Sequence, residues 1–204
     1  MKKIALAASL AFAFGANAQA AVLTTTFAGG NGQNGNMFDV VTNANALTVT
    51  GLDLNLNAGT YTIEVYKKAG TWVGSQSNAS AWTLVDSASV TSLGGQTFFN
   101  VADFGLGALG TTGLYITSVA PVGTGVLSYT NGSAVGNVFS QNADLAILEG
   151  AGKQYAFADT FTPRIWNGSI YYQVDATDVP EPASLALFGL GLAGLGLLRR
   201  RKQA

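Results

Sequence analysis

The chain has 204 residues, which is enough for one ordinary domain with a segment at each end, or for two small domains. It contains no cysteine and no histidine, and only 10% of its residues are charged. These absences exclude disulfide scaffolds, zinc fingers, iron–sulfur clusters and the common catalytic triads. The formal net charge of −1 argues against nucleic acid as a partner, because phosphate binding needs a basic surface.

The first twenty residues have the three parts of a secretory signal peptide. Met1-Lys2-Lys3 is a basic start, residues 4–14 are apolar, and small residues follow up to Ala20. The apolar run is too short to span a bilayer, which takes about 20 residues. Ala18 and Ala20 fit the small-residue positions of a signal-peptidase site. We therefore expect export through the Sec translocon and cleavage after Ala20, with cleavage after Ala18 as the alternative.

Residues 21–178 have the pattern of an all-β exported domain. Short strands are expected in chain order at 22–27, 37–42, 47–56, 61–65, 82–88, 97–101, 114–119, 126–129, 145–148 and 170–174. The alternation slips in phase at Gly51, which predicts a bulge or bend. Residues 57–59 resemble a turn, so the strands on either side are expected to form a hairpin. About ten strands separated by Gly, Asn, Ser and Thr predict a β-sandwich or jelly roll.

Residues 29–36 form a polar, glycine-rich stretch that we expect to be a connecting loop. The stretch does not lead from a buried strand into a helix, which argues against a phosphate cradle. It also lacks the alternating carboxylates of an EF-hand loop. A weak calcium site, formed by backbone carbonyls and Asp39, is the alternative. No other metal and no cofactor is expected.

The three tryptophans are the candidates for ligand binding. Trp72 lies between Gly70 and Gly74, which predicts a loop, and an exposed tryptophan could stack on a sugar ring. The favoured interpretation, however, is that Trp72 folds back over a sheet edge, and stacking on a sugar is the alternative. Trp82 and Trp166 are expected in the core.

The acidic residues form no recognisable catalytic pair. A glycosidase needs two carboxylates about 5–10 Å apart, one of them with a raised pKa. Glu64 lies on the polar side of its strand and Glu149 at a strand end, so both are expected to be solvated. The exported part has four basic and ten acidic residues, a net charge of −6 that favours solubility. We expect it to be noncatalytic.

The C-terminal segment, residues 179–204, contains a second sorting pattern. It begins with Val179, Pro180, Glu181 and Pro182. The apolar residues 183–198 follow, and as a helix they would be about 24 Å long, enough for a membrane with local thinning. The basic residues Arg199, Arg200, Arg201 and Lys202 come last. Because such a cluster stays in the cytoplasm, we expect one transmembrane helix with the β-domain outside.

This tail resembles the PEP-CTERM sorting signal, which is also catalogued as an ice-binding protein C-terminal domain, a label that denotes no activity. The resemblance rests on Pro180-Glu181-Pro182, the short helix and the basic cluster in that order. It implies a Gram-negative bacterium that makes exopolysaccharide, and processing by an exosortase. The protein would be anchored in the inner membrane before processing and would then reach the cell surface or the extracellular matrix of a biofilm.

Residues 61–85 and 162–172 are similar to uncharacterised exported β-sandwich domains, for which no activity is assigned. Together the two resemblances imply a noncatalytic surface or matrix protein associated with exopolysaccharide. A carbohydrate-binding module for the cell's own polysaccharide is the alternative, with Trp72 as its candidate residue. A glycoside-cleaving enzyme is a third and weaker alternative.

Overall fold

The computed structural model describes residues 20–175, which form fifteen β-strands and one short 3-10 helix, η1 (Ala79–Ala81). The strands are β1 (Ala20–Thr24), β2 (Asn31–Gln33), β3 (Gly35–Thr42), β4 (Leu47–Leu56), β5 (Gly59–Ala69), β6 (Thr83–Ser92), β7 (Gly95–Phe99), β8 (Phe104–Leu106), β9 (Thr111–Ser118), β10 (Leu127–Asn131), β11 (Val138–Gln141), β12 (Leu145–Leu148), β13 (Gly150–Lys153), β14 (Thr160–Trp166) and β15 (Gly168–Val174). The predicted all-β class is confirmed for this part of the chain. Four of the five additional strands have only three or four residues, too few to display an alternation in the sequence, and the fifth, β14, has seven.

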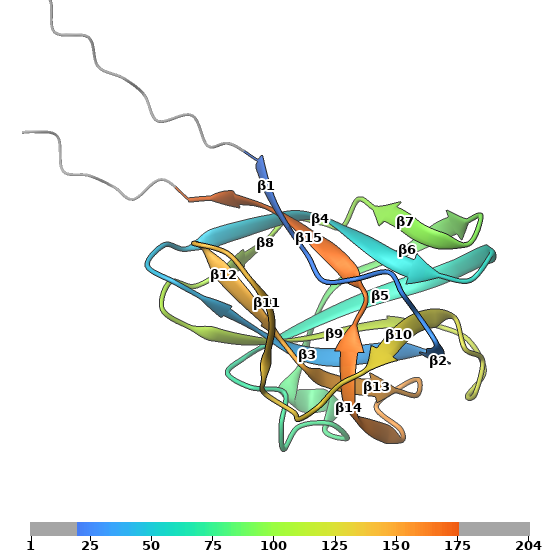
Figure 1. Cartoon of the computed structure of the whole chain (residues 1–204). Helices are drawn as coiled ribbons and strands as arrows, with labels where there is room; N and C mark the ends of the chain where they lie inside the picture. Colours follow the sequence, from blue (N-terminus) through green and yellow to red (C-terminus); the bar gives the residue numbers. More distant parts are fainter. Residues whose placement is uncertain (1–19, 176–204) are drawn as a thin grey trace, which may run out of the picture.

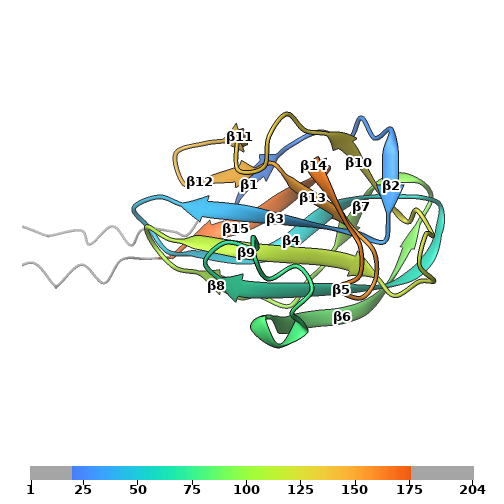
Figure 2. The same cartoon turned by 90° about the horizontal axis from the view of Figure 1, so that it is seen from below.

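All fifteen strands belong to one hydrogen-bonded sheet (Figure 1). Its main path runs β1-β15-β4-β10-β14-β13-β3-β9-β5-β6, and the pairings between these strands are antiparallel. Figure 2 shows β3, β9, β5 and β6 side by side at the second end of this path. A sandwich was expected to have two separate sheets. Here β10 pairs with both β4 and β14 and so connects the two halves.

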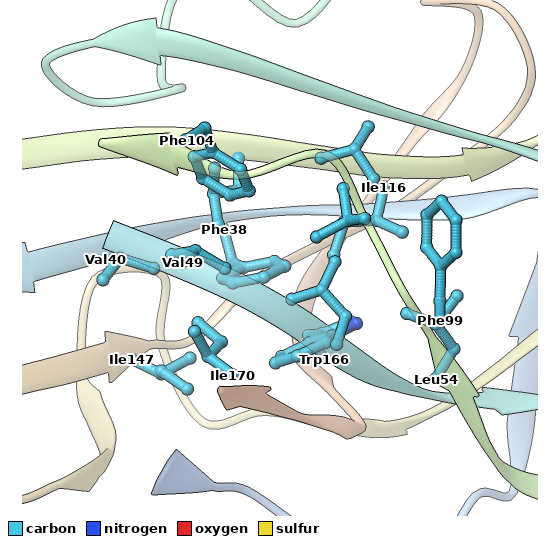
Figure 3. Packing of buried hydrophobic residues seen from close by; sticks show 14 of the residues in the cluster. Phe38, Val40, Val49, Leu54, Phe99, Phe104, Ile116, Ile147, Trp166 and Ile170 are labelled. Atoms are coloured by element: carbon cyan, nitrogen blue, oxygen red, sulfur yellow. The ribbon is translucent and has the colours of Figure 1, made fainter. Parts of the chain in front are cut away.

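The main core lies between strands that are not neighbours in the sheet. Phe38 of β3, Leu54 of β4 and Ile116 of β9 belong to one buried cluster, although β4 lies far from β3 and β9 along the path. Figure 3 shows these side chains turned toward one another. Trp166 stacks on Phe38 with 4.6 Å between ring centroids, so its predicted core position is confirmed. The sheet therefore bends around a common interior.

The predicted bulge in β4 is confirmed, but the predicted hairpin is wrong. Tyr171 of β15 pairs with Gly51 and Tyr172 pairs with Val49, which leaves Thr50 without a partner in β15. The hairpin would have paired β4 with β5. Instead β5 pairs with β6 and β9, because after β4 the chain crosses to the other half of the sheet.

Strand β3 is buried on both faces. Phe38 and Val40 belong to the main core, whereas Met37 belongs to a second buried cluster. This aromatic cluster consists of Met37, Tyr66, Trp72, Trp82, Tyr115, Ala151 and Phe157, with Ala81 at its side. Because side chains alternate along a strand, the aromatic cluster lies on the face of β3 opposite to the main core. Residues 70–82 and 154–159 cover the aromatic cluster on the side away from β3.

The first and last described strands lie side by side. Ala20 of β1 is the register partner of Gln173 of β15, so the described chain begins and ends at one region of the sheet (Figure 1). Between residues 20 and 175, no helix is long and apolar enough to cross a membrane. The predicted signal peptide, the sorting motif and the predicted transmembrane helix at 183–198 lie outside the described residues.

Candidate functional site

Trp72 is a buried residue of the aromatic cluster, as the interpretation that it folds back over the sheet predicted, and the alternative of an exposed, sugar-stacking tryptophan is wrong. Its side chain is 2% exposed. Gly70 and Gly74 have the positive φ angles of 74° and 85°, which glycine adopts at little cost, so the chain reverses on both sides of Trp72. This reversal brings the indole back onto the sheet. An indole covered in this way offers no face to a ligand.

The carboxylate of Asp39 holds this reversal in place. Its Oδ1 accepts a hydrogen bond of 2.9 Å from the backbone N–H of Trp72, and its Oδ2 accepts one of 2.6 Å from the Thr71 hydroxyl. Burial raises the pKa of Asp39, while these hydrogen bonds and the nearby charge of Lys68 oppose that rise. No sequence pattern predicts this contact, because Asp39 and Trp72 are brought together only by the fold.

Residues 29–36 were expected to be a connecting loop, with a weak calcium site that included the Asp39 carboxylate as the alternative. That stretch is not a plain loop, since it forms β2 and the start of β3, and β2 pairs with β10. A side chain at Gly35 would place its Cβ 2.3 Å from the carbonyl oxygen of Ile116, so this glycine is required for close packing. Among the described residues, no group of three acidic side chains is arranged to hold a metal ion.

Three other rings of the aromatic cluster, those of Tyr66, Trp82 and Phe157, pack edge to face or stacked around Tyr115. The ring centroid of Tyr115 lies 5.0 Å from that of Phe157, 5.7 Å from that of Tyr66 and 6.1 Å from that of Trp82. The indole N–H of Trp82 donates to the carbonyl of Ser75 over 3.0 Å. The predicted burial of Trp82 is therefore confirmed. Phe157 was not predicted, because it lies in a connection with no periodic pattern.

Glu149 is buried, so the prediction that it is solvated is wrong. Its carboxylate accepts hydrogen bonds of 2.9 Å from the Ser133 hydroxyl and 2.9 Å from the backbone N–H of Ala134. Gly132 leaves the space for this carboxylate, because a Cβ there would lie 2.5 Å from Oε2 of Glu149. The carboxylate stabilises a turn between β10 and β11. Glu64 is partly exposed and accepts a 2.8 Å hydrogen bond from the Tyr66 hydroxyl.

Lys153 is a fully buried cation that the sequence analysis did not single out. Its Nζ donates to the carbonyl oxygen of Ala158, and to the Thr160 hydroxyl over 2.9 Å. Burial lowers the pKa of Lys153 to about 8, and the nearby charge of Asp159 opposes this shift. The ammonium group holds together the two ends of the 154–159 connection, which covers the aromatic cluster.

Because the pKa of Lys153 is lowered in the folded domain, we expect the domain to become more stable as the pH rises above 8. Its pKa falls from the ordinary 10.5 to about 8 on folding, so in this window the unfolded chain binds more protons than the folded chain. The free energy of unfolding should therefore rise with pH, with a slope of at most about 1.4 kcal/mol per pH unit. Urea unfolding between about pH 7 and about pH 9.5 measures this slope.

The control variant Lys153→Met should lack the alkaline rise. Above about pH 10 the trend should reverse, because burial raises the pKa of Tyr115 and of Tyr172 to about 12. The unfolded tyrosines then lose their protons first, which stabilises the unfolded state. An identical pH profile for Lys153→Met and the original protein would contradict the assignment to Lys153.

Comparison with known proteins identifies the C-terminal segment. Residues 178–202 match the family described as the PEP-CTERM protein-sorting motif, which confirms the predicted sorting signal. The matched segment contains Val179, Pro180, Glu181 and Pro182, and the basic residues Arg199, Arg200, Arg201 and Lys202. No curated protein and no solved structure matches the chain. The motif marks an exported protein that an exosortase sorts, with a C-terminus anchored in the membrane before processing.

Proposed function

We propose that this chain is a noncatalytic protein of the cell surface or extracellular matrix, built on a sandwich-like β-domain and associated with exopolysaccharide. The observation that carries the proposal is the PEP-CTERM motif at residues 178–202, directly after a domain whose tryptophans are all buried. Aromatic side chains packed inside serve folding, whereas a catalytic or binding cleft would display them. The burial of Trp72, Trp82 and Trp166 thus favours a structural role.

The hydrogen bonds of two buried carboxylates support the proposal that the protein is noncatalytic. Asp39 and Glu149 are buried, and each accepts hydrogen bonds from a backbone N–H and a hydroxyl of a nearby turn. A carboxylate held in this way stabilises a loop, and its lone pairs are already occupied. A glycosidase would instead present two carboxylates toward a common substrate.

The position of the described ends supports surface display. β1 and β15 are neighbours, so both ends of the domain leave from the same region of the sheet. A domain whose ends are close together can be tethered by its C-terminal tail without distortion. The apolar residues 183–198 would then form the membrane anchor, with the basic residues 199–202 in the cytoplasm.

Processing at both ends is the expected result that tests the proposal. The mature chain should begin near Ala21 and end between Asp178 and Pro182, because signal peptidase acts after Ala20 and the exosortase acts at Pro-Glu-Pro. Intact-mass analysis of the protein from membrane and culture-medium fractions measures both ends. The precursor should be confined to the membrane fraction.

The variant Glu181→Ala is the control, since it alters the motif and leaves the apolar segment and the basic residues unchanged. It should accumulate in the membrane fraction with Arg199–Lys202 still attached. Protein in the medium that retains these basic residues, in the original chain, would refute sorting through this tail.

A further inference from the structure

The outer face of β1, β15, β4 and β7 exposes an aromatic ring that the fold does not need for its core. Phe98 of β7 is 56% exposed, whereas its neighbour Phe99 is buried in the main core. Phe98 packs edge to face against Tyr171 of β15, with 5.5 Å between ring centroids and 80° between planes. The alternation of side chains places Phe98 on the face that points away from the main core.

Gly51 of β4 gives Phe98 its position. A Cβ at Gly51 would lie 2.8 Å from Cε2 of Phe98, so the ring lies directly over the backbone of β4. Gly51 is also the register partner of Tyr171, which brings both rings to one place on the sheet. The exposed ring is therefore held by its contacts, and its position is defined before any ligand arrives.

A buried carboxylate lies beside these rings. Asp53 of β4 is the register partner of Phe98. Its Oδ2 accepts two hydrogen bonds of 2.8 Å, from Nε2 of Gln96 and from the Tyr171 hydroxyl. Its Oδ1 accepts no hydrogen bond from any residue in 20–175, so this oxygen keeps its lone pairs for another donor. The hydrogen bond from Tyr171 raises the pKa of that phenol.

We propose that Phe98, Tyr171, Asp53 and Gln96 form a binding site for a neutral sugar ring of a polysaccharide. The proposal rests on the association with exopolysaccharide proposed above. It places sugar binding at the exposed ring of Phe98, because Trp72 is buried and cannot stack on a sugar. The apolar face of a pyranose ring stacks on Phe98, a sugar hydroxyl donates to Oδ1 of Asp53, and Gln96 and Tyr171 orient that carboxylate.

The charges of the domain favour a neutral sugar over a uronic acid. The basic residues between 20 and 175 are Lys67, Lys68, Lys153 and Arg164, and none of them lies on β1, β4, β7 or β15. Asp53 would repel a second carboxylate that approached Phe98. A free carboxylate oxygen beside an exposed ring thus suits a ligand that is rich in hydroxyl groups and carries no negative charge.

The test is affinity electrophoresis of the full-length protein in gels containing one polysaccharide. The neutral probes are galactomannan and hydroxyethylcellulose, and polygalacturonate is the anionic probe. Exopolysaccharide purified from the cells that make the protein is the probe for the wider association. At least one neutral probe should retard the protein more than polygalacturonate does. Phe98→Ala should weaken this binding about tenfold, as expected for a lost stacking contact, and Phe98→Tyr should retain it.

Leu84→Ala is the matched control, since Leu84 is 49% exposed on β6 and is the register partner of Tyr66 on β5. It should bind like the original protein. Asp53→Asn should weaken binding with Phe98 in place, and the melting temperature of each variant verifies that it is folded.

The outcomes separate the site from the wider function. Retardation of Phe98→Ala equal to that of the original protein would overturn the site and leave the association with exopolysaccharide standing. Failure of the original protein to bind either neutral probe would overturn the site, and failure to bind the cells' own exopolysaccharide as well would overturn both. A dimer in the original protein that Phe98→Ala converts to a monomer, with sugar binding unchanged, would assign the face to self-association and overturn the sugar site.

Discussion

Replacing Trp72 with alanine should lower the free energy of unfolding by about 3–5 kcal/mol, the usual cost of removing a buried tryptophan. The indole is 2% exposed and packs with Met37, Trp82 and Tyr115 on the second face of β3. Its removal leaves a cavity beneath residues 70–82, which only partial relaxation can fill. Urea unfolding followed by circular dichroism measures the change as a shift of the midpoint at constant slope.

The adjacent residue provides the control. Val73 is 50% exposed, so Val73→Ala should change the free energy of unfolding by no more than about 0.5 kcal/mol. Trp82→Ala should resemble Trp72→Ala, because both indoles belong to the aromatic cluster. A Trp72→Ala protein as stable as Val73→Ala would mean that the indole is exposed in solution, and would restore Trp72 as a candidate for stacking on a sugar.

The second large effect is expected at Gly150. In Gly150→Ala the new Cβ would lie 2.0 Å from the carbonyl oxygen of Met37 and 2.8 Å from the Cα of Phe38. These are backbone atoms of β3, the strand buried between the main core and the aromatic cluster, so no side-chain rotation relieves the clash. We expect a loss of about 3 kcal/mol or more, at the upper end for overpacked sites, in the same urea measurement.

Gly105→Ala is the matched control for this substitution. Gly105 also lies in a strand, β8, but nothing lies within 4 Å of a Cβ built there. Alanine should therefore be neutral or stabilise the protein by up to about 1 kcal/mol, because it lowers the entropy of the unfolded chain. Equal stability of the two variants would show that β13 does not approach β3 as closely as described.

The function proposed here depends on two parts of the chain that act separately. The tail directs the exported protein to an exosortase, and in the proposed function residues 20–175 form the part that is displayed. Substitutions such as Glu181→Ala should change localisation without changing stability. Substitutions at Phe98 should change binding to a neutral polysaccharide without changing localisation, which makes the two functions separable in one set of variants.

The sequence by itself determined the sorting signal and the fold class. A sorting motif is read as a linear stretch, so Pro180-Glu181-Pro182, the apolar run and the basic cluster suffice to recognise it. The all-β class follows from alternation and turn residues, which are also local properties. The phase slip at Gly51 predicted a real bulge, since a change of phase moves every later side chain to the other face of the strand.

Only the tertiary structure decided which residues are buried on the second face of β3, and which strands pair. Trp72, Lys153 and Glu149 were misjudged or missed because their burial depends on connections far away in sequence that fold over them. The hairpin expected around residues 57–59 failed for the same reason, as β5 finds its partners in β6 and β9. Local patterns describe one strand at a time, whereas burial and pairing depend on the strands and loops that the whole chain brings against it.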